Sequence, residues 1–194
     1  MNYAQKFFGH LKTVLKHKYW VWYYMHKCGC GWRGLWHDMS KFSPVEFFES
    51  VKYYTGTRSP IDVCKEENGV SMAWMHHKGR NPHHYEYWQD NFDYGGEPKE
   101  MPWKYKVEMI CDYLAAGRAY MGKNFSYKAE YKWWLKKLES PRRQHEKDKE
   151  FVTNIFKRLV HEEWACGHKH ATNIFKYAVL AAKDGLYGGW HMKV

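Results

Sequence analysis

Proline marks the start of most of the helices that this sequence predicts. Proline suits the first position of a helix, because its φ angle is already helical and the N–H that it lacks would have no partner there. Five of the six prolines open a segment of this kind, in the pairs Ser43-Pro44, Ser59-Pro60, Asn81-Pro82, Met101-Pro102 and Ser140-Pro141. Glu46 follows Ser43 by three residues, which is the pattern of a capping box. The pairs therefore divide the chain into helices joined by turns.

Between these starts the apolar residues recur with helical spacing, for example at Val107, Ile110 and Leu114. No segment alternates apolar and polar residues for long enough to indicate a strand. We therefore predict an all-α protein, a compact bundle of seven or eight helices. The predicted helices cover residues 2–27, 44–54, 60–78, 82–92, 102–122, 126–139, 143–165 and 169–184. Residues 1–139 are expected to form one helical domain, and residues 140–194 a helical pair packed on it.

The charge of the chain favours an anionic partner. Its 194 residues can bury a sizeable core, and 31 basic against 21 acidic residues give a net charge of +10. Such a surplus attracts nucleotides, phosphate esters and nucleic acid. We expect an anionic small-molecule substrate, with a nucleotide preferred and nucleic acid as the alternative partner. The sequence leaves the oligomeric state open.

The cysteines and the N-terminus bear on the compartment. The five cysteines are odd in number and sparse, which favours a reducing environment over a disulfide framework. The first twenty residues, MNYAQKFFGHLKTVLKHKYW, contain lysines throughout and lack the apolar run of a signal peptide. No window has the length and apolar character of a membrane span. A cytoplasmic protein without a membrane partner is the expectation.

Four histidines lie within nine residues in the stretch HHKGRNPHHYEYW, which begins at His76. On one unbroken helix, residues seven apart such as His76 and His83 would be about 10 Å apart along the axis, too far to share an ion. The Asn81-Pro82 pair prevents such a helix, so a bend there could bring His77 and His83 together. We favour His77 and His83 as ligands, followed by His84 and then His76. The alternative is a solvated basic surface.

A second candidate element is His37-Asp38 in LWHDMSKF. One carboxylate has two oxygens and can hold both ions of a pair about 3.5–4 Å apart. His17 lies twenty residues earlier on the first predicted helix. Asp112 lies on an apolar helix, where an unpaired carboxylate is costly. A metal ion would balance this charge, and a lysine or arginine is the alternative partner.

The order of these residues resembles that of the HD-domain metal-dependent phosphohydrolase superfamily, in which His, His-Asp, one or more His and Asp follow one another. The segment LWHDMSKF is similar to the LLHDIGK segment of that superfamily, and CDYLAAGRAY is similar to its helix with the final aspartate and a following arginine. The resemblance covers roughly residues 10 to 125. His77, Asn81, His83 and His84 also match the His-x3-Asn-x-His-His element of a bacterial and phage branch.

The resemblance implies an HD-like metal-binding domain within residues 1–139. It also implies one or two divalent transition-metal ions, drawn from Mn, Fe, Zn, Co and Ni. The implied metal ligands are His17, His37, Asp38, His77, His83, His84 and Asp112.

The implied reaction is hydrolysis of a phosphate ester, a nucleotide or a phosphodiester, by a water that the metal activates. Fixed cations would stabilise the charge on the phosphoryl oxygens, and we expect Lys41, Arg80 and Arg118 to supply them. One alternative is a di-iron oxygenase that uses O2 and the same ligands. Another is a basic nucleic-acid-binding protein without catalytic activity.

Overall fold

The computed structural model describes residues 1–90, 93, 95–140 and 143–183 of the chain, and it is all-helical over these residues, without a strand. The α-helices are α1 (Tyr3–Lys27), α2 (Gly31–Trp36), α3 (Pro44–Lys52), α4 (Pro60–Asn68), α5 (Met72–Lys78), α6 (Trp103–Met121), α7 (Tyr127–Glu139), α8 (Glu146–Cys166) and α9 (His168–Lys183). Short 3₁₀ segments are η1 (Met39–Phe42), η2 (Tyr85–Trp88) and η4 (Gly122–Asn124). The predicted fold class is confirmed, with nine helices in the described part where seven or eight were expected.

The main hydrophobic core lies between α6 and its neighbours α1, α7, α8 and α9. Helix α6 is buried along most of its length, and the C-terminal half of α1 crosses it. Trp134 of α7, Phe156 of α8 and Phe175 of α9 are each fully buried in this core. The helices α8 and α9 therefore share one core with α1 and α6, while the proposed division at residue 139 stays a prediction.

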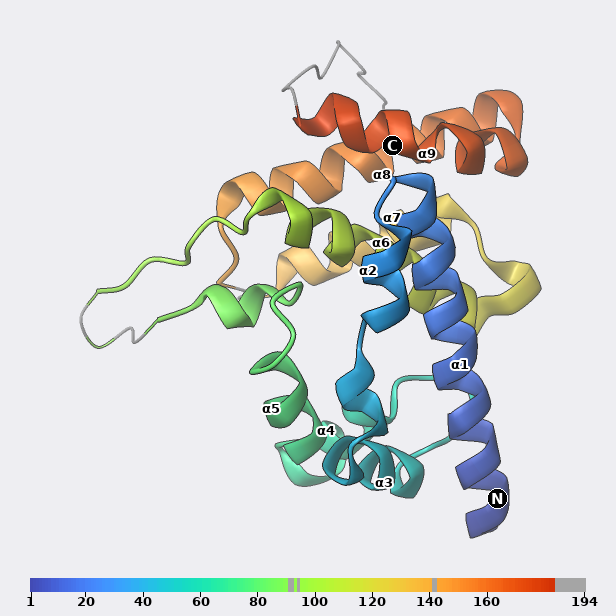
Figure 1. Cartoon of the computed structure of the whole chain (residues 1–194), viewed down its shortest axis with the longest axis vertical. Helices are drawn as coiled ribbons and strands as arrows, with labels where there is room; N and C mark the ends of the chain where they lie inside the picture. Colours follow the sequence, from blue (N-terminus) through green and yellow to red (C-terminus); the bar gives the residue numbers. More distant parts are fainter. Residues whose placement is uncertain (91–92, 94, 141–142, 184–194) are drawn as a thin grey trace.

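A second packing region surrounds the N-terminal half of α1. Figure 1 shows α3, α4 and α5 gathered near this end of α1, while α8 and α9 lie at the other end of the molecule. Phe47, Val51, Tyr54 and Ala73 are buried here. None of them belongs to the main core.

The prolines begin helices largely as predicted. Pro44 and Pro60 occupy the first turns of α3 and α4, and Pro102 precedes α6. The start expected at Ser140-Pro141 is different, since α8 begins at Glu146, and residues 141–142 lie outside the described part of the chain.

The helix predicted over residues 60–78 is in fact two helices. Helix α4 ends at Asn68 and is capped by Gly69, which has a φ of 75° and adopts the left-handed conformation that glycine tolerates best. Helix α5 starts at Met72 and is capped by Ser71, whose hydroxyl oxygen accepts a hydrogen bond from the Trp74 N–H at 3.1 Å. The Glu49 carboxylate accepts further bonds from the Ala73 N–H and the Ser71 hydroxyl. The apolar residues keep a helical spacing across this break, so the sequence pattern did not indicate it. Because of the break, α5 packs against α3.

The helix predicted over residues 82–92 is also wrong. Only the 3₁₀ segment η2 is present there, and residues 91–92 lie outside the described part. His84 has extended backbone, with φ of −88° and ψ of 133°. The Trp88 indole N–H donates to the Pro82 carbonyl at 2.6 Å, which holds the segment in a compact turn.

Helix α2 was not predicted, because it is short and lies in a glycine-rich segment. It packs closely on α1, and a Cβ atom added at Gly34 would lie 2.9 Å from the Cα of Trp22. Only glycine permits this approach without a shift of one helix. The close packing fixes the end of α2, where His37 and Asp38 follow. Among the described residues, no helix is long and apolar enough to cross a membrane.

Candidate metal centre

Asp38 lies at the centre of a buried cluster of histidines and carboxylates. It follows α2 in the left-handed conformation, with φ of 53°, and only 2% of its surface is exposed. Its two carboxylate oxygens face two different groups of side chains. Asp38 therefore belongs to both groups.

The first group lies on the Oδ2 side of Asp38 and consists of His17, His37 and Asp112. The Nε2 atom of His37 lies 3.0 Å from Asp38 Oδ2 and 3.3 Å from Asp112 Oδ1. The Nε2 atom of His17 lies 3.6 Å and 3.1 Å from the same two oxygens. One potential ligand atom from each of the four residues lies within 4.8 Å of the others. This group could hold a metal ion.

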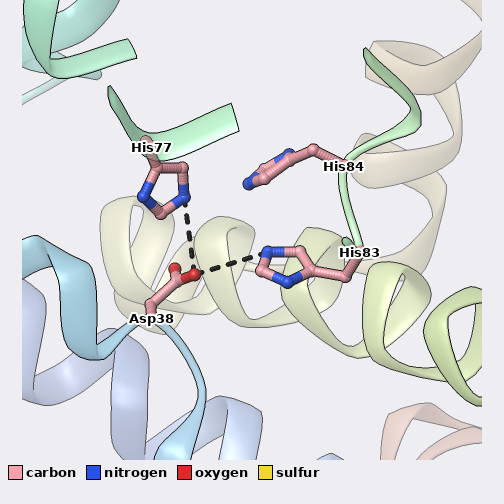
Figure 2. Close-up of side chains that lie close together, drawn as sticks. All are labelled: Asp38, His77, His83 and His84. Atoms are coloured by element: carbon pink, nitrogen blue, oxygen red, sulfur yellow. Dashed lines mark ion pairs between the residues drawn. The ribbon is translucent and has the colours of Figure 1, made fainter. Parts of the chain in front are cut away.

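The second group lies on the Oδ1 side of Asp38 and consists of His77, His83 and His84. Figure 2 shows His77 and His83 approaching the same oxygen from two directions, each with Nε2 at 3.4 Å. The His84 ring lies beside both, with centroid distances of 4.8 Å and 4.3 Å. These residues and Asp38 also have ligand atoms within 4.8 Å of one another.

The Asn81-Pro82 bend brings the second group together. Helix α5 ends at Lys78, and the Asn81 side chain donates to the His77 carbonyl at 2.8 Å and to Ser40 Oγ at 2.9 Å. The chain then reverses, so that His83 faces His77. Because His84 is extended rather than helical, both members of that pair turn inward. His76, ranked last of the four histidines by sequence, lies outside this group, and its Nδ1 atom pairs with Glu46.

Two buried glutamates hold the outer nitrogens of the histidines. Glu46 lies 2.7 Å from His77 Nδ1. Glu108 lies 3.0 Å from His37 Nδ1 and 3.5 Å from His83 Nδ1, and thus joins the two groups. A histidine that binds a metal through one nitrogen commonly donates its other N–H to a carboxylate. His37, His77 and His83 all have this arrangement.

The ionisation of the two aspartates in the cluster depends on their burial and on the cationic and imidazole groups beside them. Burial would raise the pKa of Asp38, but His37 and Lys41 hold it well below its usual value. The pKa of Asp112 is likewise well below its usual value, because hydrogen bonds from His17 and His37 outweigh the effect of burial. Both carboxylates are therefore ionised.

The pKa values of the histidines in the cluster are shifted in different directions. Burial favours a neutral His37, but the Asp38 carboxylate outweighs it and raises the pKa of His37 well above its usual value. Burial and neighbouring histidines lower the pKa values of His83 and His84. Neutral imidazole is the form that binds a metal ion.

Several inner atoms of the cluster lack a hydrogen bond although they are buried. They are the Nε2 atoms of His83 and His84 and the Oδ1 atom of Asp38. A buried polar atom without a hydrogen bond is costly, and these three atoms lie together in the second group. Imidazole nitrogens and carboxylate oxygens together suit Mn, Fe, Co, Ni or Zn. The donor set therefore fits the transition metals expected from the sequence, without selecting one.

The three predicted cations have different positions. Lys41 lies in the cluster, with Nζ 2.5 Å from Asp38 Oδ2. Arg80 is exposed in the turn after α5, where its guanidinium donates to the His76 carbonyl at 3.5 Å. Arg118 is directed elsewhere, because its guanidinium bonds to the Tyr24 hydroxyl and to His168 on α9.

Sequence reasoning missed the two supporting glutamates. Glu46 was interpreted as part of a capping box, but only its backbone N–H bonds to Ser43, while its carboxylate holds His76 and His77. Glu108 lies one helical turn before Asp112. Residues four apart share one face of a helix, so this spacing was a usable signal.

A third group, at the junction of α8 and α9, contains Glu162, Cys166 and His170. Here His168 pairs with Glu163 and His170 with Glu162. Cys166 and His170 are exposed, and Glu162 also pairs with Arg158. This group is much less enclosed than the one around Asp38.

A protein-family model matches residues 6–158, which is most of the chain. The chain belongs to DUF5662, a family of unknown function. All seven predicted ligands lie inside the matched segment, while α9 lies beyond it. No curated protein and no solved structure matches the chain.

Proposed function

We propose that this member of DUF5662 is a metal-dependent phosphohydrolase in which two divalent transition-metal ions share Asp38. The observation that carries the proposal is the pair of buried ligand groups on the two oxygens of one carboxylate. The outer carboxylates of Glu46 and Glu108 support it further, because they fix the orientation of the histidine rings.

The resemblance to the HD-domain superfamily supports the same reading. The ligands occur in the order of that superfamily, and the described residues form an all-helical fold, as the resemblance implies. His17 comes from α1, Asp112 from α6 and His77 from α5. The phosphate-ester substrate and the two metal ions are both part of the proposal, and the ions are drawn from Mn, Fe, Co, Ni and Zn.

When bound, the metal ions would lower the pKa of a coordinated water toward neutrality and withdraw charge from the phosphoryl group. The chain itself supplies a fixed cation beside them. Burial would lower the pKa of Lys41, but the Asp38 carboxylate outweighs this effect and raises it, so the ammonium group stays charged. We assign Lys41 the role of binding a phosphoryl oxygen, while Arg80 stays a weaker candidate.

The test compares two chemistries on purified protein that has been loaded with metal. Phosphate release from a panel of phosphate esters is measured with Mn2+ in the absence of O2, and O2 consumption is measured with iron. Hydrolysis without O2 is expected. A requirement for both iron and O2 would instead establish the oxygenase that we consider the second candidate.

A matched pair of variants completes the test. Replacing His77 by Ala should abolish phosphate release, whereas replacing the exposed His26 by Ala should leave it unchanged. Equal activity in both variants would contradict the proposal. Binding to nucleic acid that falls steeply with salt and is the same in both variants would favour the binding protein.

A further inference from the structure

A cavity of about 190 Å³ lies against the ligand cluster. His17, His77, His84 and Asp112 line it, so a molecule in the cavity would touch the candidate metal centre. Helix α1 runs along it, because His10 lines it as well. Residues seven apart on a helix differ by about 10 Å along the axis. His10 therefore lies well away from the cluster, in the outer part of the cavity.

The walls between these two parts are largely apolar. Val14, Ile61, Ala73 and Ala116 contribute to them, from α1, α4, α5 and α6. Among the described residues that line the cavity, Lys41 alone is a lysine or arginine, and it pairs with Asp38 at the cluster. Such walls suit a short carbon chain better than a second charged group.

The volume limits the substrate. A cavity of about 150 Å³ holds benzene, and pockets for larger ligands have volumes of roughly 300–1,000 Å³. At about 190 Å³, the cavity has room for a molecule somewhat larger than benzene. The base and ribose of a nucleotide exceed this space, so the nucleotide that the net charge suggested fits poorly.

His10 is one of the polar residues that line the cavity, together with Thr13, Ser50, Ser59 and Tyr120. It is 7% exposed, its ring packs against Phe47 and Tyr54, and its Nδ1 atom makes no hydrogen bond. Burial, with the charge of Lys41, lowers the pKa of His10 to about 4, so the imidazole is neutral. A buried nitrogen without a partner is unfavourable unless a ligand completes its hydrogen bonds.

We propose that the substrate is a small phosphate monoester whose alkyl group carries a hydroxyl, with the phosphate at the metal centre and the hydroxyl bonded to His10. This inference rests on the proposed function. In the reaction, the oxygen of one water forms a bond to phosphorus and the ester P–O bond breaks. The departing alkoxide takes up a proton from the water, which gives inorganic phosphate and a diol.

The experiment measures kcat/KM of the metal-loaded protein for propyl phosphate, for the same ester with a terminal hydroxyl, for phenyl phosphate and for adenosine monophosphate. The hydroxylated ester should exceed propyl phosphate by about tenfold, the effect of one hydrogen bond to a buried group. Adenosine monophosphate should be the poorest substrate. Replacing His10 by Phe should remove the preference for the hydroxylated ester, and His10→Gln should restore part of that preference.

A second variant tests the cavity itself. Ala116→Leu places additional atoms in the wall and should reduce turnover of both alkyl esters, with the metal content unchanged.

The outcomes separate the two proposals. The inference is wrong, and the proposed hydrolase stands, if esters are hydrolysed but kcat/KM for the hydroxylated ester does not exceed that for propyl phosphate. The same conclusion follows if His10→Phe lowers kcat/KM for both alkyl esters by the same factor. If the metal-loaded protein hydrolyses none of the four esters, the proposed function is wrong and the inference falls with it.

Discussion

At the scale of single residues, the candidate centre depends most on Asp38. Among the described residues it is the one non-glycine residue with a positive φ, a conformation that costs roughly 1–3 kcal/mol when the surrounding structure imposes it. This backbone turns the carboxylate so that one oxygen faces His37 and the other faces His77. Strain at a functional position is expected where the structure around it is rigid.

Glu108 provides the first prediction at this scale. Its carboxylate bonds to His37 and is close to His83, and Arg33 holds its second oxygen at 2.6 Å. Glu108→Gln should lower metal affinity by roughly 10–100-fold, as expected when an outer partner of a ligand is lost. Competition with a chelator measures this. The exposed Glu67→Gln variant is the control, and an unchanged affinity in Glu108→Gln would show that this carboxylate has no part in metal binding.

The sequence predicted the members of the buried cluster better than their surroundings. His17, His37, Asp38, His83 and Asp112 were recognisable because their side chains and their order are chemically distinctive. A glutamate on a helix is not distinctive, since most glutamates are exposed. The spacing of Glu108 from Asp112 was a usable signal, but its burial and its two histidine partners are what identify its role.

Arg118 shows that a short sequence separation from Asp112 on one helix does not by itself place a side chain at the cluster. It lies six residues after Asp112, which places it about 120° round the helix from that residue. On that face it meets Tyr24 and His168 rather than the cluster.

At the scale of the elements, two short segments position the site. Helix α2 was not predicted, because six residues are too few for a periodic pattern to be visible, and it sets the position of His37 and Asp38. The bend at Asn81-Pro82 was predicted, but the residues after it were interpreted as helix, although His84 has extended backbone and both His83 and His84 turn inward. By contrast, the long helices α1 and α6 were predicted within two residues at each end, because many apolar positions define their spacing.

Gly34 gives the prediction at this scale. A Cβ at this position would meet the backbone of Trp22 on α1, so Gly34→Ala must displace α2. We expect a loss of roughly 1–3 kcal/mol in the free energy of unfolding, and weaker metal binding as well, because Asp38 moves with α2. Thermal unfolding and metal titration measure the two effects. Gly79→Ala is the control, since its Cβ would have ordinary contacts, and equal behaviour of the two variants would contradict the packing argument.

At the scale of the whole molecule, one core joins α1, α6, α7, α8 and α9. Part of its stability should depend on pH through Glu130 of α7. This residue is buried against Gly117 of α6, where a Cβ would collide with the Glu130 carboxylate. Burial raises the pKa of Glu130 from 4.5 to about 7.

The sign of the effect follows from this shift. Between about pH 4.5 and 7 the unfolded chain loses the Glu130 proton while the folded protein keeps it, so the free energy of unfolding falls as the pH rises. The fall contributed by Glu130 is at most roughly 3 kcal/mol. Urea unfolding of the protein and of Glu130→Gln across this range measures it by difference. A difference between the two proteins that is constant with pH would contradict the assignment.

The central claim is that Asp38 holds two metal ions at once, and metal content per chain tests it most directly. Asn accepts the left-handed conformation of this position, so Asp38→Asn keeps the fold while it removes the shared charge. Elemental analysis should find about two transition-metal ions per chain in the native protein, about one in Asp112→Asn and less than one in Asp38→Asn. Less than one ion in the native protein, or an unchanged content in Asp38→Asn, would contradict the claim.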